Sequence, residues 1–295
     1  ADVYPSKPVQ VIVFFNPGAV VDILGRAIAE EMGQFLNQQF VIVNREGAGG
    51  MVGVNVASQA RPDGYTLLFG PPGPLTIQPH IRKDLAYTLD SCVPICQVFE
   101  NQFVVVVGHN SPLKSLDDVI KAARAAPSRM TWGVFGLGGV PHLQFYSLLL
   151  DAKVDMVAVP YKSIATMTAD ATAGQLDIGV TAFGSFGVGT VRVLASLAGQ
   201  RNELYPDVPA APELGYRVSD SAYGGFLAPK GTPADALTAL EGACAKAAQT
   251  PRWKDVLKRT GSPGPYLGSD GYGKRLREDF RVKGELVRIL DIKAE

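Results

Sequence analysis

The sequence predicts an α/β protein of two lobes, each with a sheet covered by helices. Apolar runs of strand length alternate with segments of helical spacing over residues 9–69, and a second series of the same kind begins at residue 103. With 295 residues, the chain is long enough for two lobes of about 120–170 residues each. The 32 glycines and 21 prolines indicate many tight turns between these elements.

The first series reads strand, helix, strand, helix, strand. Residues 9–15 form a near-continuous apolar run, as expected for a strand that is covered on both faces. Residues 22–36 carry apolar side chains at helical spacing, and residues 52–60 predict a second, short helix. Residues 40–43 and 65–69 are typical of strands. This order predicts a parallel sheet with helices on both faces.

The second series repeats the alternation, and Ser115 with Asp118 gives a capping-box signal for its first helix. It predicts strands at 103–107, 131–134, 154–159, 176–182 and 192–198 and helices at 116–126, 142–152 and 164–173. A strand at 223–228 and helices at 233–249 and 271–290 follow. The mixed charges of the last helix are typical of a solvated face.

The C-terminal helices are left over from the two series, and we expect them to return to the first lobe. This assigns residues 1–102 and 224–295 to domain 1 and residues 103–223 to domain 2, with hinge crossings near 98–104 and 220–226. Two lobes joined by paired crossings form a hinge, and hinged clefts close around ligands.

Charge and motif content exclude several classes of function. Lys plus Arg and Asp plus Glu are both 28, so the chain lacks the basic excess that nucleic acids or anionic membranes require. No nucleotide-binding glycine motif and no nucleophile-elbow motif occurs, and the three histidines lack metal-ligand spacing. We therefore expect no catalytic residues, no metal, no cofactor and no nucleic-acid partner.

The cysteines and the first residues bear on the compartment. We interpret Cys92, Cys96 and Cys244 as small apolar core residues, with a Cys92–Cys96 disulfide as the alternative. The first residues show neither the basic nor the apolar region of a signal peptide. That fits a cytosolic protein or a secreted one whose signal peptide is already removed.

Two glycine-containing turns, at Gly18 and at residues 136–139, each follow a predicted strand and precede a helix. Such turns aim backbone N–H groups and the positive end of a helix dipole at whatever lies there, and anions are the natural guests. The alternative is that glycine only makes a tight turn. Two such turns in two lobes favour an anion clamp.

Short motifs with a fixed order run along essentially the whole chain. They are Tyr4-Pro5-x-Lys7-Pro8, Asp22-Ile23-x-x-Arg26, Asn44-Arg45-x-Gly47-Ala48-Gly49-Gly50, Asp63-Gly64-Tyr65-Thr66-Leu67-Leu68, Pro141-His142-Leu143, Val159-Pro160-Tyr161-Lys162, Pro206-Asp207-Val208-Pro209 and Ala228-Pro229-x-Gly231-Thr232-Pro233. In number and order they make the chain resemble the solute-binding receptors of the tripartite tricarboxylate transporter system, the Bug family.

The resemblance implies two Rossmann-like α/β lobes joined by a hinge, a type II periplasmic-binding-protein-like fold with the ligand in the interlobe cleft. It also implies a periplasmic location, a small carboxylate as ligand, and delivery of that ligand to the membrane permease subunits of the system. We expect a monomer.

Carried over onto this sequence, the resemblance places ligand contacts in the loop before the first helix, the loop before the Pro-His-Leu helix and the Tyr-Lys segment. The expected ligand-binding residues are Phe15, Asn16, Pro17, Gly18, Ala19, Val20, Val21, Asp22, Pro72, Phe135, Gly136, Leu137, Gly138, Val140, His142, Tyr161, Lys162, Ser163, Phe183 and Gly184.

This sequence departs from the family pattern at the expected contacts. The family usually has Gly-Gly-Ser-Thr-Asp where this chain has Gly18-Ala19-Val20-Val21-Asp22, and a Ser-x-Gly-x-Gly loop where this chain has Val134-Phe135-Gly136-Leu137-Gly138. The family's Tyr-Lys-Gly reads Tyr161-Lys162-Ser163 here. In both loops before the helices, apolar side chains have replaced hydroxyl groups.

The apolar replacements favour an aromatic carboxylate as ligand, above all a benzene dicarboxylate such as terephthalate. Further apolar side chains at the ends of nearby strands support this: Phe14, Phe15, Phe135, Phe183 and Phe186. Three alternatives stay open: a receptor for an aliphatic dicarboxylate of four to six carbons, a ligand-sensing subunit of an extracytoplasmic signalling system, and a small-acid α/β enzyme.

Overall fold

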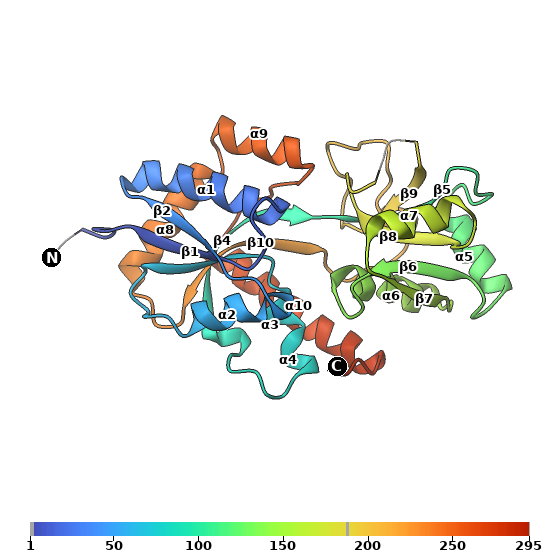
Figure 1. Ribbon diagram of the computed structural model, residues 1–295, viewed down its shortest axis with the longest axis horizontal. Helices are drawn as coiled ribbons and strands as arrows, with labels where there is room; N and C mark the ends of the chain where they lie inside the picture. Colours follow the sequence, from blue (N-terminus) through green and yellow to red (C-terminus); the bar gives the residue numbers. More distant parts are fainter. Residues whose placement is uncertain (1–2, 187–188, 295) are drawn as a thin grey trace. The chain divides into compact units, whose positions relative to one another are not determined.

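The computed structural model describes residues 3–186 and 189–294, and the chain folds into two compact units (Figure 1). Unit 1 comprises the chain up to Glu100, Tyr223–Gly284 and the residues from Asp291, and unit 2 comprises Asn101–Ala222 and Glu285–Leu290. The sequence analysis divides the chain after residues 102 and 223 and places the whole C-terminal helix in domain 1, whereas the end of that helix belongs here to unit 2.

Unit 1 contains a six-stranded sheet with the order β11-β4-β10-β3-β1-β2. As predicted, β1 pairs in parallel with β2 and β3, whereas β10 runs antiparallel to β3 and β11 antiparallel to β4. The sequence analysis has no strand at β4, because Pro94 and Gln97 interrupt its apolar pattern. The strands are β1 (Val9–Val13), β2 (Phe40–Asn44), β3 (Thr66–Gly70), β4 (Cys92–Asn101), β10 (Ala222–Pro229) and β11 (Leu267–Gly268).

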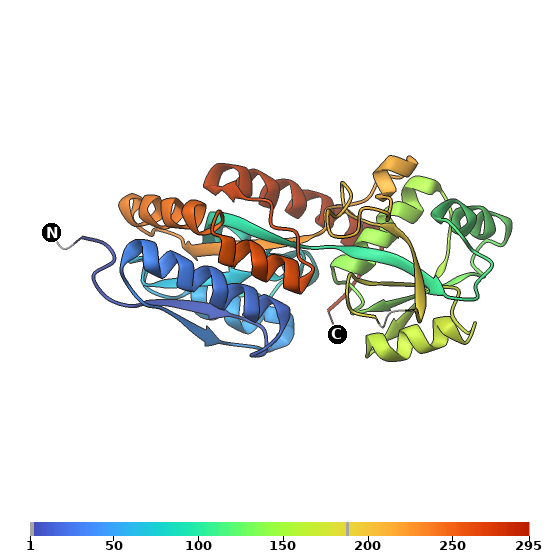
Figure 2. The ribbon, with the colours of Figure 1, turned by 90° about the horizontal axis from the view of Figure 1, so that it is seen from above.

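Helices cover both faces of this sheet (Figures 1 and 2). Alternate residues of β1 point to opposite faces, so Val11 and Val13 lie in a core with α1, α8 and α9, while Ile12 and Phe14 lie in a core with α2, α3 and α10. The helices are α1 (Val20–Leu36), α2 (Met51–Ser58), α3 (Gly73–Thr76), α4 (Gln78–Ile81), α8 (Ala234–Ala247), α9 (Pro251–Thr260) and α10 (Ser269–Ile289), with short 3₁₀ turns at Ala48–Gly50 and Leu89–Ser91.

Helix α10 is anchored to the sheet by buried charges. The Lys283 Nζ atom lies 2.7 Å from Asp279 Oδ1, and the Tyr223 hydroxyl donates to Asp279 Oδ2 at 2.9 Å. Both charged side chains are buried, which corrects the expectation that the charged residues of this helix form only a solvated face. A buried pair of this kind is retained where each charge has a partner, because a lone buried charge is strongly destabilising.

Unit 2 contains a five-stranded sheet with the order β7-β6-β8-β5-β9. β6 is parallel to β7 and β8, as the repeated strand–helix alternation suggests, but β5 is antiparallel to β8 and β9. β5 follows β4, a strand of the unit 1 sheet, after Gln102 alone, and the helix Leu116–Ala125 then connects β5 to β6, which is not its neighbour in this sheet. The strands are β5 (Phe103–Gly108), β6 (Thr131–Phe135), β7 (Val157–Tyr161), β8 (Ile178–Ala182) and β9 (Val191–Ser196).

Three helices of unit 2 match predicted ones, namely α5 (Leu116–Ala125), α6 (Val140–Ala152) and α7 (Ile164–Thr172), and a 3₁₀ turn covers Ala211–Leu214. At the start of α5 the Ser115 hydroxyl accepts the Asp118 N–H at 3.1 Å, which confirms the predicted cap. Within the described residues of both units, no helix combines the length and the apolar character that crossing a membrane demands.

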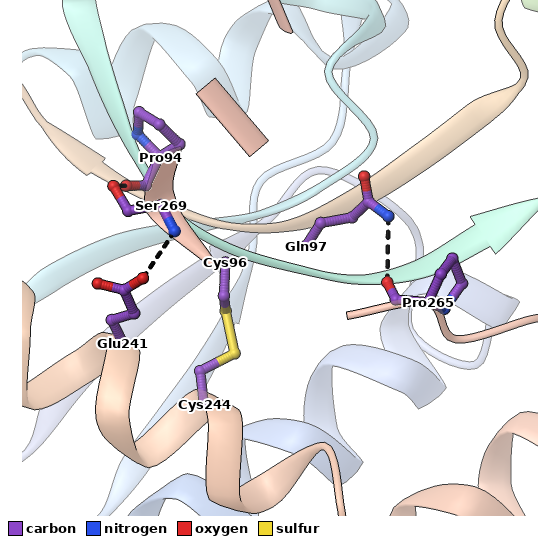
Figure 3. Close-up of a disulfide and its surroundings, with 7 residues drawn as sticks. All are labelled: Pro94, Cys96, Gln97, Glu241, Cys244, Pro265 and Ser269. Carbon is purple, nitrogen blue, oxygen red and sulfur yellow. Dashed lines mark hydrogen bonds between the residues drawn. A yellow bond between two sulfur atoms is a disulfide. The ribbon is translucent and has the colours of Figure 1, made fainter. Parts of the chain in front are cut away.

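A disulfide joins Cys96 on β4 to Cys244 on α8, across 148 residues of sequence (Figure 3). All three cysteines are buried, as expected for core residues, but the alternative Cys92–Cys96 pair is wrong, and Cys92 is the free thiol. Two further contacts hold β4 nearby: Gln97 Nε2 donates to the Pro265 carbonyl at 3.1 Å, and the Ser269 hydroxyl donates to the Pro94 carbonyl at 2.9 Å (Figure 3).

Removing the disulfide is expected to destabilise unit 1. Because a cross-link over a long loop restricts the unfolded chain, Cys244→Ala should lower the free energy of unfolding by about 2–4 kcal/mol. Chemical denaturation measures the change, and reduction of the wild-type protein should reproduce it. Cys92→Ala is the matched control, since it alters a buried thiol outside the bond. A reductant that leaves the wild-type stability unchanged contradicts the expectation.

Candidate functional site

Two loops occupy equivalent places in the two units, each between the carboxyl end of a parallel strand and the start of a helix. Loop 1 (residues 15–22) connects β1 to α1, and loop 2 (residues 135–142) connects β6 to α6 (Figure 1). Each loop as defined here includes the first turn of its helix. Ligands of α/β sheets bind at the carboxyl ends of the strands, so both loops lie where a site is expected.

Loop 1 turns into its helix through a hydrogen bond from a glycine. The Gly18 N–H donates to Asp22 Oδ2 at 2.9 Å, and the Ala19 N–H donates to the Asn16 carbonyl at 3.1 Å. Gly18 has φ +86°, in the left-handed region where a side chain is strained. The glycine therefore has a conformational reason to be here, and its N–H is already engaged.

Asp22 is a buried side chain that holds loop 1 in place through its hydrogen bonds. Its side chain is only 2% exposed, and it accepts hydrogen bonds from Arg26 Nε at 3.0 Å and from Asn44 Nδ2 at 2.9 Å. The same Asn44 amide nitrogen donates to the Phe15 carbonyl at 2.9 Å, which ties β2 to the start of the loop. Burial alone would raise the pKa of Asp22, but the bonds from Arg26, Asn44 and Gly18 outweigh it and lower that pKa.

Loop 2 repeats this geometry with a different side chain. The Gly138 N–H donates to His142 Nδ1 at 2.8 Å, the Gly139 N–H donates to the Gly136 carbonyl at 3.1 Å, and Gly138 has φ +76°. His142 is 7% exposed, and its ring centroid lies 5.5 Å from that of Trp132 on β6. Burial lowers the pKa of His142, so the ring is neutral and Nδ1 is free to accept.

Because the N–H groups of Gly18 and Gly138 already have acceptors, other N–H groups are left to bind a ligand at the two loops. The first backbone bond of α1 runs from Ile23 to the Ala19 carbonyl, and that of α6 from Leu143 to the Gly139 carbonyl. The N–H groups before these bonds belong to the first helical residues and have no acceptor within the helix. They are those of Val20, Val21 and Asp22 in loop 1 and of Val140 and His142 in loop 2, since Pro141 has none.

Several apolar side chains of the two loops lie on the surface of their own unit. Val20 is 46% exposed, Phe135 52% and Leu137 55%. Val21, in contrast, packs in the core between the sheet and α1, and does not contribute to the loop surface. Asn16 is exposed, and its side-chain amide lies against the Glu46 carboxylate.

The other expected site residues follow neighbouring strands. In unit 1, Pro72 lies after β3 and precedes α3, at the same edge of the sheet as loop 1. In unit 2, Tyr161 ends β7, and Phe183 and Gly184 follow β8, so they share the sheet edge of loop 2. Each unit therefore gathers its own expected residues at one edge.

Most of these residues already have partners within the chain. The Tyr161 hydroxyl donates to Asp170 at 2.7 Å, and burial followed by this bond raises the pKa of Tyr161 to about 12. Ser163 caps α7 by accepting the Thr166 N–H at 3.1 Å. The Phe183 ring stacks on Tyr205 with centroids 4.3 Å apart. Lys162 is exposed, and no group of three metal-ligating side chains gathers anywhere in the described parts of the chain.

A groove of about 820 Å³ lies elsewhere, beside the edge strand β2. Residues 37–42 and the polar side of α1, from Arg26 to Gln34, line it. The lining comes from α1, from the connection at residues 37–39 and from the first residues of β2, and no residue of loop 1 belongs to it. The groove is therefore separate from the loops that carry the expected contacts.

Sequence reasoning missed the residues that support the loops. It gave no role to Arg26 or Asn44, although both stand in quoted motifs, and none to Trp132 or Tyr205. One signal was available: both loops place a hydrogen-bonding side chain four residues after a glycine, as Asp22 follows Gly18 and His142 follows Gly138. In a capping box the side chain of the third helical residue likewise reaches back to an N–H at the helix start, but over three residues rather than four.

Comparison with known proteins confirms the resemblance. Residues 24–292 match the TctC family model, described as the tripartite tricarboxylate transporter family receptor. Protein BugT of Bordetella pertussis is 32% identical over 241 residues, which cover 79% of this chain and 73% of BugT. The chain is thus similar to a Bug protein over most of its length.

Solved structures confirm the two-lobe α/β fold. A TctC solute-binding protein from Polaromonas is 24% identical with a TM-score of 0.87, over 97% of this chain and 99% of that one. MatC from Rhodopseudomonas palustris, solved with bound malate, is 25% identical with a TM-score of 0.75, over 96% of this chain and 100% of that one. From its sequence and its fold alike, the chain belongs to the TctC family of tripartite tricarboxylate transporter receptors.

Proposed function

We propose that this receptor binds an aromatic dicarboxylate, with terephthalate as the representative ligand. One observation carries the proposal: apolar side chains stand exposed on the same loops that offer N–H groups to an anion. Val20 does so in loop 1, and Phe135 and Leu137 do so in loop 2. A ligand that combines negative charge with a flat apolar ring matches both features.

The charged ends of the ligand bind at the helix starts. Each hydrogen bond from an N–H group to a carboxylate contributes about 1.5–3 kcal/mol, and the dipole of α1 or α6 adds to it. At loop 1 the buried Asp22 charge does not oppose an anion by itself, because Arg26 lies 3.0 Å away and compensates it. We assign one carboxylate to each loop, and the expected hinge near residues 98–104 and 220–226 is the movement by which both loops would share a ligand.

The exposed apolar side chains of the two loops favour a ligand with an aromatic ring over a ligand with a hydroxyl group. Burial of a ring against an apolar wall of about 100 Å² contributes about 2.5 kcal/mol. A ligand hydroxyl against the same wall loses its water without a new partner, at a cost of about 1–3 kcal/mol. These two effects have the same sign, so they favour an aromatic acid over a hydroxylated aliphatic one.

An aliphatic dicarboxylate is the second candidate. MatC, which shares the fold over essentially its whole length, was solved with malate. The N–H groups at the two helix starts serve any carboxylate, whatever joins its two ends. The aromatic and the aliphatic candidate differ in the group that joins the two carboxylates, and the apolar side chains of the loops would contact that group.

The Cys96–Cys244 disulfide supports a periplasmic role, since such bonds form and persist in oxidising compartments. We propose that the receptor works there as a monomer, closes on its ligand and delivers it to the permease of its transporter. The family is one of receptors, and binding followed by release needs no catalytic group.

Calorimetry with purified protein tests the proposal. We expect terephthalate to bind with a micromolar or lower Kd, and malate and succinate to bind at least about tenfold more weakly, a difference of about 1.4 kcal/mol. Micromolar binding of malate or succinate, with no heat from benzoate, phthalate isomers or hydroxybenzoates, would sink the aromatic assignment and leave the aliphatic one.

A polar side chain on loop 2 is expected to shift this preference. Leu137→Ser should weaken terephthalate binding about tenfold, because it removes apolar contact area, and should not weaken malate. Leu214→Ser is the matched control, since Leu214 is a similarly exposed leucine on the 3₁₀ turn of unit 2. Equal losses for both ligands would show that Leu137 supports the loop rather than the ring.

Lys162 is expected to contribute to the second carboxylate. It is the exposed cation directly after β7, at the sheet edge of loop 2. Lys162→Met should weaken terephthalate more than benzoate, by about three- to tenfold. Lys121→Met, an exposed lysine on α5, serves as the charge control. If both ligands weaken equally, Lys162 is a bystander.

A further inference from the structure

Loops 1 and 2 share one design but differ in the group that completes it. In each, the glycine N–H is taken by the side chain four residues later, and the residue after the glycine donates to the carbonyl three residues before itself. The acceptor is a carboxylate in loop 1 and an imidazole in loop 2. Both side chains are buried, so neither extends over the loop surface.

We propose that His142 is the positioning residue of loop 2 and acts through Gly138, in the role that Asp22 has in loop 1. The inference rests on the proposed function, because the N–H groups that it positions are those proposed to hold the ligand carboxylate. His142 Nδ1 accepts the Gly138 N–H at 2.8 Å, and this bond fixes the turn directly before the helix start that carries the Val140 and His142 N–H groups. The imidazole itself does not touch the ligand.

This role requires the neutral ring. An Nδ1 atom that carries a proton is a donor, and it cannot accept the Gly138 N–H. His142 contacts two uncharged groups, the Trp132 ring of β6 and the Gly138 N–H of loop 2, and burial lowers its pKa. In the parts of the chain that the structure describes, no acidic side chain raises the pKa of His142 again.

The two loops therefore respond differently to acid. The folded-state pKa of His142 is below its unfolded value of about 6.5, so the stability that the neutral ring contributes is complete above about pH 6.5 and falls as the pH drops below it. The pKa of Asp22 is lowered as well, so its contribution persists to below about pH 4. Protonation of His142 therefore releases loop 2 and leaves the bonds of Asp22 in loop 1 intact.

The ligand-free protein provides the first test, by NMR. We expect His142 to carry its proton on Nε2 at neutral pH, and the Gly138 amide to lose its protection against exchange as His142 titrates. The Gly18 amide, bonded to Asp22, is the internal control and should not change over the same range. A proton on Nδ1, or a Gly138 amide unaffected by the titration, overturns the proposal.

Two variants distinguish the hydrogen-bond acceptor of His142 from the titration of its imidazole ring. His142→Asn keeps an oxygen near the place of Nδ1 but does not titrate, so protection of Gly138 should persist in acid. His142→Leu removes the acceptor, so protection should be lost at all pH values. Thermal unfolding checks that both variants fold. A His142→Asn protein that still loses protection in acid contradicts the role assigned to His142.

Calorimetry with terephthalate provides the second test, at about pH 7.5 and about pH 5.5. The apparent affinity falls with the fraction of protein whose loop 2 is in place, so wild type should bind more weakly at the lower pH, by less than about tenfold because the pKa of His142 lies below its usual value of about 6.5. His142→Asn should bind equally at both. An affinity that rises in acid would mean that the imidazolium contacts the carboxylate directly, and the positioning role would be wrong.

The two tests fail separately. If terephthalate binds at neither pH, the aromatic assignment in the proposed function is wrong, while the Gly138 amide still decides the role of His142. If terephthalate binds but the exchange protection of the Gly138 amide does not change as His142 titrates, the proposed receptor function is supported and the positioning role is wrong.

Discussion

The path of both loops depends on one hydrogen bond, from a glycine N–H to a side chain four residues later. Gly18 and Gly138 have positive φ, so the chain reverses without strain and the next residues start a helix. The acceptors, Asp22 and His142, lie on the first helical turn and point back under the loop. With the glycine N–H groups satisfied in this way, the donors left for an anion are those of the first helical residues.

The frame that carries these loops is held from both faces of the sheet in unit 1. The Cys96–Cys244 disulfide ties β4 to α8 on one face. On the other face, Asp279 of α10 accepts the hydroxyl of Tyr223, which lies on β10. β4 and β10 are neighbours in the sheet and are the strands next to the two boundaries between units 1 and 2. Their anchoring inside unit 1 leaves the short connections beyond them as the places where the proposed hinge can bend.

Similar geometry with different chemistry gives the two loops different properties. Asp22 is compensated by Arg26 and held by Asn44, so loop 1 is tied to β2 as well as to its own helix. The His142 ring contacts the Gly138 N–H and the Trp132 ring, and both groups belong to loop 2 or to the strand before it. Loop 2 also carries the two most exposed apolar side chains of the pair of loops, Phe135 and Leu137. We expect ligand specificity to depend more on loop 2 and anchoring more on loop 1.

The sequence by itself determined the α/β alternation, most helices, the family and the places of both loops, because periodicity and glycine position are local properties. Three features were decided only by the tertiary structure. The partner of Cys96 lies 148 residues away, where no spacing rule reaches. β5 runs antiparallel to β8 and β9, and these pairings join segments far apart in the sequence. The Gly18 and Gly138 N–H groups are engaged because the first helical turn brings Asp22 and His142 back to them, and hydrogen-bond partners follow from that geometry rather than from residue type.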